Sequence, residues 1–196
     1  MESYDTIEML HLACNISFFM KQTIEQIKNL LLQMKTLDQE MRNQKPIDKD
    51  KFSKIDQQHT NKLKEIVDKY GLIDIERFGK DVSKAAWLLV QHAPKTEIKF
   101  MEKYLCLMQT HPDKVSQKNT AYLEDRVNMY LNKPQVYGTQ VVSNPEGMME
   151  FYKIENIQEI DKRRFSVELE TLADYAKRFS PNIILPKEYK VDPKYS

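Results

Sequence analysis

Two polar side chains lie near the end of an otherwise apolar segment, AAWLLVQHA, at residues 85–93. The imidazole of His92 can exchange protons near neutral pH, and the amide of Gln91 can both donate and accept hydrogen bonds. The segment predicts a buried helix, in which an unpaired amide or imidazole would cost roughly 1–3 kcal/mol. Gln91 and His92 must therefore have polar partners, which either form a site or only tie neighbouring helices together.

Carboxylates and arginines that could serve such a site occur in other segments. Asp38 and Arg42, within LDQEMR, stand four residues apart on a predicted helix, a spacing equally typical of a surface ion pair. Asp56 and His59 share one helix face, where the carboxylate could orient a proton-transferring histidine or the pair could bind a metal. Because no third ligand or zinc motif accompanies them, we predict no metal and no cofactor.

The segments AYLEDRV and QVYGTQ supply the remaining candidates. Asp125 and Arg126 are adjacent in a helical pattern, so we expect one of them to face inward. Gln135, Tyr137 and Gln140 surround a glycine, a residue that often marks a bulge or a close backbone approach. These three side chains could bind a ligand, or the stretch could be the twisted edge of a hairpin.

Hydrophobic periodicity predicts the elements that position these residues. Five helices are expected, over residues 6–43, 51–70, about 81–93, 96–110 and about 116–131. After Pro134, the runs QVYGTQVV and MMEFYKI flank the turn-forming SNPEG and predict a β-hairpin. Short helices are expected over residues 156–164 and 171–179. The predicted fold is mainly α, a single-domain helical bundle with a small β-hairpin after the fifth helix.

The chain of 196 residues is long enough for one well-buried domain. We interpret residues 1–35 as an N-terminal amphipathic helical extension that packs on the domain or on another copy of the chain. Residues 36–179 are the expected helical core with its hairpin. Residues 180–196 contain three prolines without periodicity and predict an extended C-terminal tail.

Charge and composition limit the expected partners. Lysine and arginine number 30 against 29 acidic residues, so neither nucleic acid nor an anionic membrane is expected. No apolar run approaches the roughly 20 residues of a membrane span, and no signal peptide pattern is present. Cys14 and Cys106 lack ligand spacing and predict buried free thiols. We expect a cytoplasmic protein with a small-molecule ligand, and a homodimer or protein partner remains open.

Taken together, the sequence motifs of this chain resemble those of an uncharacterised bacterial family of domains of unknown function. The resemblance rests on DQxxR from Asp38, AAWLLVQHA, AYLxDRV, QVYGTQ and IDKRR, and it spans roughly residues 36–178. The chain departs from the family pattern at His59, where asparagine is expected, and at Glu168, where glycine is expected. The resemblance implies no activity, but it implies that the polar residues recur as a set. That set comprises Asp38, Arg42, Asp56, Gln91, His92, Asp125, Arg126, Gln135, Tyr137 and Gln140.

Two functions are compatible with this set. The first hypothesis is an acid–base hydrolase of a small polar or phosphorylated molecule, with His92 as general acid or base and Asp56 or Asp125 orienting it. The residues expected to bind substrate are Arg42, Asp38, Gln91, Arg126, Gln135, Tyr137 and Gln140. The alternative is a non-catalytic binding, immunity-like or regulatory module whose polar residues are a structural network. No P-loop, Rossmann fingerprint or Ser-His-Asp signature narrows the class.

Overall fold

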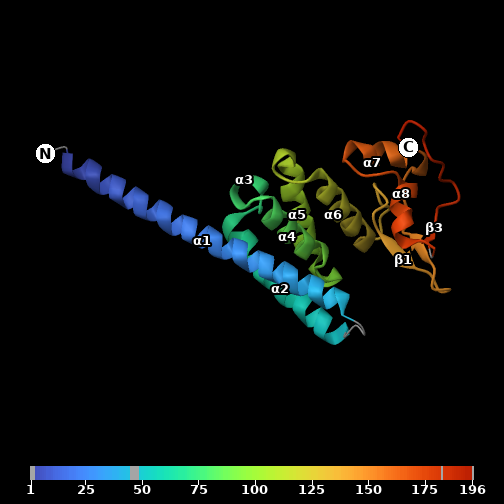
Figure 1. The fold of residues 1–196 in the computed structure, drawn as a ribbon, viewed down its shortest axis with the longest axis horizontal. Coiled ribbons are helices and arrows are strands. Elements are labelled where there is room, and N and C mark those ends of the chain that lie inside the picture. Colours follow the sequence, from blue (N-terminus) through green and yellow to red (C-terminus); the bar gives the residue numbers. More distant parts are fainter. Residues whose placement is uncertain (1–2, 45–48, 182, 196) are drawn as a thin grey trace.

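The structure is a computed structural model that describes residues 3–44, 49–181 and 183–195. Within these ranges the chain is mainly helical, with one small sheet, as the sequence predicted (Figure 1). The α-helices are α1 (Ser3–Asn43), α2 (Lys49–Tyr70), α3 (Ile75–Phe78), α4 (Lys80–Gln91), α5 (Ile98–Thr110), α6 (Gln117–Tyr130), α7 (Ile160–Ser166) and α8 (Leu172–Ala176). Short 3-10 helices are η1 (Lys95–Glu97), η2 (Pro112–Lys114), η3 (Ile157–Glu159) and η4 (Lys177–Phe179). The strands are β1 (Val141–Ser143), β2 (Met149–Phe151) and β3 (Ile183–Ile184).

Helix α4 is the centre of the helical part of the fold. It packs against α1, α2, α3, α5 and α6, so neighbours surround it on most sides. Apolar surfaces of these neighbours face the helix in almost every direction. Its segment AAWLLV accordingly carries no charge, and Ala85, Ala86 and Val90 are fully buried. The helix ends at Gln91, and the backbone N–H of His92 still donates to the carbonyl of Leu88. His92 therefore lies at the C-terminal end of a central, tightly held helix.

Helix α1 is 41 residues long, and its N-terminal half extends away from the other helices (Figure 1). Its C-terminal half belongs to the main core, because Ile27, Leu31 and Met34 are buried in the same cluster as residues of α2, α4 and α5. All three of these residues fall within the predicted extension, whose boundary at residue 35 stays a prediction. None of the described helices is long and apolar enough to cross a membrane.

The sheet has the order β1–β2–β3. Strands β1 and β2 form the predicted antiparallel hairpin, with Val141 opposite Phe151, whereas β3 pairs with β2 in parallel. The stretch QVYGTQ is not part of β1: it forms an irregular loop with one bridge, between Gln135 and Ile154. This loop cannot continue the strand because Asp125 engages backbone N–H groups at 136, 137 and 139.

The described residues after Ser180 lie along the surface and pack against a second hydrophobic core, which is separate from the core around α4. Ile183 and Ile184 form β3, and the hydroxyl of Tyr189 donates to Asp161 at 2.8 Å. Phe151, Ile160, Leu172 and Tyr175 are buried in this core between the sheet, α7 and α8. The tail predicted to be extended therefore contributes one strand and a hydrogen-bonded tyrosine.

Cys106 corrects one expectation from the sequence. It is a free cysteine, but it is exposed rather than buried. It follows Leu105, which is buried, and successive side chains on a helix point about 100° apart, so Cys106 faces away from the core. The side chain of Cys14 lies outside the described residues.

Candidate functional site

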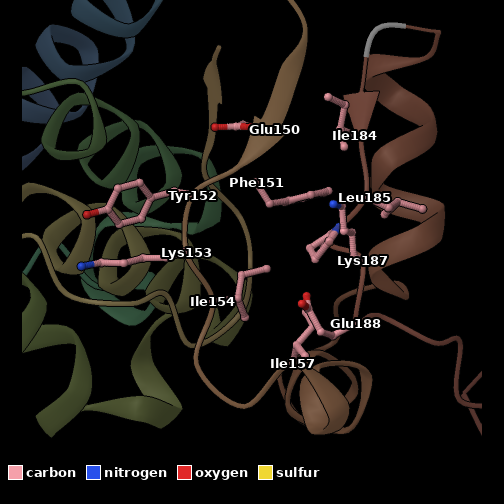
Figure 2. Close-up of a pocket in the computed structure, with 11 residues that line it drawn as sticks. Glu150, Phe151, Tyr152, Lys153, Ile154, Ile157, Ile184, Leu185, Lys187 and Glu188 are labelled. Atoms are coloured by element: carbon pink, nitrogen blue, oxygen red, sulfur yellow. The ribbon is translucent and has the colours of Figure 1, made fainter.

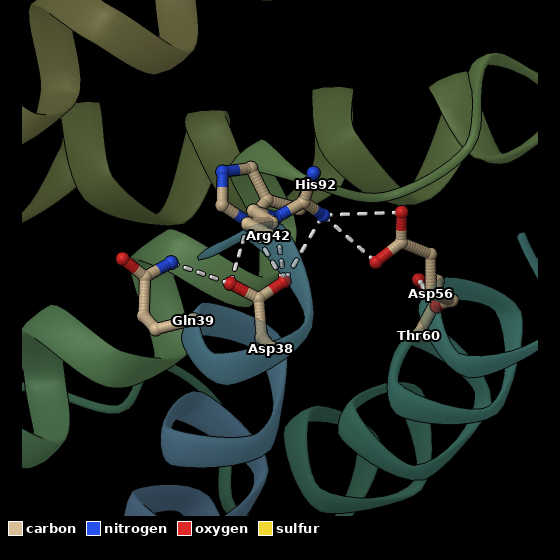
Figure 3. A network of polar contacts seen from close by, with 6 residues as sticks. All are labelled: Asp38, Gln39, Arg42, Asp56, Thr60 and His92. Carbon is tan, nitrogen blue, oxygen red and sulfur yellow. Dashed lines mark hydrogen bonds and ion pairs between the residues drawn. The ribbon is translucent and has the colours of Figure 1, made fainter. Parts of the chain in front are cut away.

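The imidazole of His92 is held by a buried carboxylate on α1. Its Nδ1 lies 2.9 and 3.0 Å from the two carboxylate oxygens of Asp38, which is only 2 % exposed (Figure 3). A carboxylate can only accept here, so Nδ1 carries the proton and Nε2 of a neutral ring is free to accept one. Figure 3 shows this second nitrogen pointing away from Asp38. An aspartate that orients a histidine in this way is a recurring arrangement in proton transfer.

Asp38 is kept ionised by several donors. The Nε2 of Gln39 donates to it at 2.7 Å, and the Nε of Arg42 donates at 3.0 Å. Burial by itself would raise the pKa of Asp38, but the hydrogen bonds from His92 and Arg42 outweigh it and lower the pKa to about 2. The spacing of Asp38 and Arg42, equally compatible with a surface pair, here belongs to a largely buried network.

Arg42 connects Asp38 to a second carboxylate. Its Nη2 donates to both oxygens of Asp56 on α2, at 2.8 and 3.1 Å, and its guanidinium lies 4.2 Å from the centre of the Phe52 ring. Burial raises the pKa of Asp56, while the charge and hydrogen bonds of Arg42 act against this rise. One arginine thus faces two carboxylates, and its positive charge is locally compensated.

His59 lies one turn after Asp56 and is 8 % exposed. Its Nδ1 is buried, and no described residue is its hydrogen-bond partner. Burial lowers the pKa of His59, although the charges of Asp38 and Asp56 act in the opposite direction. In the described part of the chain, no group of three or more His, Cys, Asp or Glu side chains is arranged to hold a metal ion.

A pocket of about 490 Å³ opens beside His92. Its walls come from the end of α1, the start of α2, the end of α4 and the last turns of α6. Its volume falls within the roughly 300–1,000 Å³ typical of small-molecule sites. The lining residues are Arg42, Phe52, Ser53, Asp56, Gln91, His92, Ala93, Pro94, Arg126 and Tyr130.

Gln91 joins α4 to α6 at the floor of this pocket. With its amide nitrogen toward the carbonyl of Tyr122 at 3.3 Å, its oxygen accepts from Nε of Arg126 at 3.2 Å. In the opposite orientation the amide oxygen would face the carbonyl of Tyr122 and the amide nitrogen would face Nε of Arg126, so neither hydrogen bond could form. We therefore assign the first orientation. Gln91 therefore satisfies its own buried amide and fixes the guanidinium of Arg126 at the pocket.

Asp125 lies elsewhere, inside the protein. It is fully buried, and its carboxylate accepts hydrogen bonds from the backbone N–H groups of Val136, Tyr137 and Thr139 at 2.7–3.0 Å. The hydroxyl of Thr139 adds a fourth donor at 2.9 Å. Burial raises the pKa of Asp125, and these four donors act against the rise. Asp125 ties the loop at residues 135–140 to α6.

Gln135 and Gln140 stabilise the same loop. The side chain of Gln135 donates to the carbonyls of Gln140 and Tyr152 at 2.9 and 2.8 Å and accepts from the N–H of Gln140 at 2.6 Å. The carbonyl of Tyr137 accepts from Nη1 of Arg164 at 2.7 Å. Neither these residues nor Asp125 lines the pocket beside His92.

The ten predicted site residues thus form two groups. Asp38, Arg42, Asp56, Gln91, His92 and Arg126 meet at or directly behind the pocket. Asp125, Gln135, Tyr137 and Gln140 organise the loop that joins α6 to the sheet.

The sequence reasoning missed several residues of both groups. Phe52 and Tyr130 line the pocket and each lies four residues from a predicted site residue, so their helix spacing could have indicated them. Arg164, in the phrase IDKRR, is fully buried, and Nε and Nη1 donate to carbonyls of Glu170 and Tyr137. Its burial had no signal in the sequence beyond the apolar spacing of Ile160.

A further pocket, of about 380 Å³, lies between the sheet and the C-terminal tail (Figure 2). Residues 150–154 and Ile157 form one side, and residues 184–188 form the other. It contains none of the predicted site residues.

The fold and the site define a mainly helical protein with a small sheet and a polar pocket at the C-terminal end of its central helix. The chain belongs to a family of unknown function, DUF6624, whose profile matches residues 25–184. This match confirms the family resemblance and extends beyond residues 36–178 at both ends. No curated protein and no solved structure matches the chain.

Proposed function

We propose that this protein is an acid–base hydrolase of a small polar or phosphorylated molecule, with His92 as its proton-transferring residue. The observation that carries the proposal is the contact of His92 Nδ1 with the buried carboxylate of Asp38, in a ring whose other nitrogen is free beside a pocket. The pair provides both a correct tautomer and a stabilised imidazolium.

In the proposed reaction, Nε2 of neutral His92 takes a proton from a water molecule whose oxygen attacks a carbonyl carbon or phosphorus. The Asp38 carboxylate stabilises the imidazolium that results, and the ring then returns the proton to the leaving oxygen. Asp38 therefore takes the orienting role that the sequence reasoning gave to Asp56 or Asp125. Asp56 instead positions Arg42, because both of its oxygens accept from Nη2 of that arginine.

In this proposal the residues of the 135–140 loop act indirectly, by positioning other residues. Asp125, Gln135 and Gln140 hold the connection after α6, the helix that carries Arg126. Tyr137 contributes its backbone N–H and carbonyl to the same connection. We assign these four residues a positioning role.

The test is a turnover screen with phosphate monoesters, phosphate diesters and carboxylic esters that release a chromophore. His92→Gln should lower any turnover by about a hundredfold or more, the usual range for loss of a general acid or base. His111→Gln, at the exposed C-terminal end of α5, is the matched control and should retain full turnover. Turnover that survives His92→Gln would refute the role of His92.

The alternative is a non-catalytic binding or regulatory module whose polar residues are structural. The observation that favours it is Asp125, all of whose described hydrogen bonds go to the 136–139 loop. Under this alternative, His92→Gln would lower the melting temperature by several degrees and no substrate of the screen would be turned over. Because the contact of His92 with Asp38 contributes to stability under either function, the turnover screen distinguishes them: only the hydrolase predicts turnover that His92→Gln removes.

A further inference from the structure

Arg126 is a cation that lines the pocket beside His92. Within the described residues it forms no ion pair, and its Nε donates to the neutral amide oxygen of Gln91 at 3.2 Å. Its guanidinium also lies 5.6 Å from the centre of the Tyr130 ring. These contacts orient the guanidinium. Its two terminal nitrogens, with their four N–H donors, have no partner among the described residues and can bind a ligand.

Arg42 differs from Arg126 in this respect. It lines the same pocket, but it pairs with Asp38 and with Asp56, at 3.0 and 2.8 Å. Two carboxylates already attract its charge, so an incoming anion gains little from it. The pocket thus has one compensated arginine and one that can receive an anionic group.

The rest of the accessible lining is partly aromatic. Phe52 on α2 and Tyr130 on α6 both line the pocket, and both are half-buried. Arg42 lies over the ring of Phe52 and Arg126 over the ring of Tyr130, so each ring is held in place by an arginine. Ala93 and Pro94 add apolar surface. Such walls favour a flat, apolar group on the same ligand that carries the anion.

We propose that the ligand of this pocket is a small aryl anion, an aromatic ring that carries a phosphate or a carboxylate. The anion binds the terminal nitrogens of Arg126, and the ring packs against Tyr130 and Phe52. This inference rests on the proposed function only in naming the same pocket, because binding does not require proton transfer by His92. The inference narrows the proposed substrate, a small polar or phosphorylated molecule, to one chemical class.

The experiment measures dissociation constants by isothermal titration for phenyl phosphate, benzoate, inorganic phosphate and phenol. We expect phenyl phosphate or benzoate to bind at least about tenfold more tightly than inorganic phosphate and phenol, a difference of 1.4 kcal/mol. Phenyl phosphate and benzoate distinguish the two anion types. If neither aryl anion binds more tightly than inorganic phosphate and phenol, the proposal is wrong.

Two substitutions test the assigned contacts with the tighter aryl anion. Arg126→Gln should raise its dissociation constant at least about tenfold, since hydrogen bonds between charged groups are lost. Arg126→Lys should recover part of the affinity, because the charge remains without the guanidinium fork. Tyr130→Leu should weaken the aryl anion more than it weakens inorganic phosphate. Unchanged binding in Arg126→Gln would overturn the assignment.

Arg178→Gln is the matched control for this substitution. Arg178 also lies over a tyrosine ring, at 5.2 Å from the centre of Tyr175, but it lies outside the pocket. The dissociation constants of the Arg178→Gln protein for the same ligands should equal those of the unsubstituted protein. A loss of affinity equal to that of Arg126→Gln would refute the proposal.

Aryl-anion binding and the turnover of His92→Gln, measured together, separate this inference from the proposed function. If the aryl anion binds through Arg126 and no substrate is turned over, the ligand class stands and the hydrolase fails. If turnover depends on His92 but no aryl anion binds preferentially, the hydrolase stands and the ligand class fails.

Discussion

Asp38→Asn is the most informative substitution, because Asp38 holds His92 from behind. In the native protein three side chains donate to its carboxylate, and the pKa is lowered from 3.8 to about 2. A pKa difference of this size between native and unfolded states corresponds to about 2 kcal/mol of stability. The side chain is 1 % exposed, so little of this contribution is lost to solvent screening.

The direction of the pKa shift of Asp38 determines how its contribution to stability depends on pH. Because the native pKa is depressed, the contribution is complete above pH 3.8 and is lost as the pH falls toward about 2. Asp38→Asn should therefore lower the free energy of unfolding by about 2 kcal/mol at pH 7, and the melting temperature by about 4–8 °C. Near pH 2 the two proteins should approach equal stability.

The assay is urea unfolding of both proteins at intervals from pH 7 to pH 2. The difference in unfolding free energy between them isolates Asp38 from the other carboxylates, which titrate in both. A difference that stays constant over this range would refute the reasoning that Asp38 is held ionised by its partners.

Three further substitutions test other parts of the structure. Asp125→Ala removes four hydrogen bonds to the 135–140 loop and should cost about 3 kcal/mol or more, measured by chemical unfolding, with faster amide hydrogen exchange in that loop. Unchanged exchange there would contradict its role. Gly138→Ala would place a Cβ 2.9 Å from Cδ1 of Ile154 at a backbone φ of +64°, so thermal unfolding should show a loss of about 1–3 kcal/mol. A melting temperature within 1 °C of the original, on the order of 0.3 kcal/mol, would be incompatible with that contact. His59→Gln should reduce the loss of stability as the pH falls below 6.5, because burial lowers the pKa of His59 and only the unfolded chain gains the proton readily. Parallel pH profiles of the two proteins would argue against a depressed pKa.

The helical core could be predicted from the sequence because its determinants are local. The uncharged segment around Ala85 predicted a buried helix, and α4 is indeed central, packed against five other helices. The hairpin was also predicted, but its first strand begins only at Val141. QVYGTQ resembles a strand in residue type, yet Asp125 binds its N–H groups from another helix, and no local pattern encodes that contact.

Six of the ten predicted site residues lie at or directly behind the pocket beside His92, but the sequence could not predict how they are arranged. Asp38, Asp56 and Asp125 carry the same functional group, and the sequence reasoning gave Asp56 or Asp125 as the partner of His92 and assigned Asp38 to substrate binding. Only the packing of α1 against α4 brings Asp38 within 2.9 Å of the imidazole. Asp125 lies on α6 beside the loop instead, and Asp56 binds Arg42.

The sequence by itself determined that Gln91 and His92 end a buried helix and need polar partners, because periodicity and the cost of unpaired polar groups are properties of short segments. It also determined the family. The tertiary structure alone decided which carboxylate contacts His92, which arginine forms no ion pair among the described residues, and which candidates hydrogen-bond in the loop instead. These choices depend on how helices distant in the chain cross and pack, and side-chain type carries no information about that geometry.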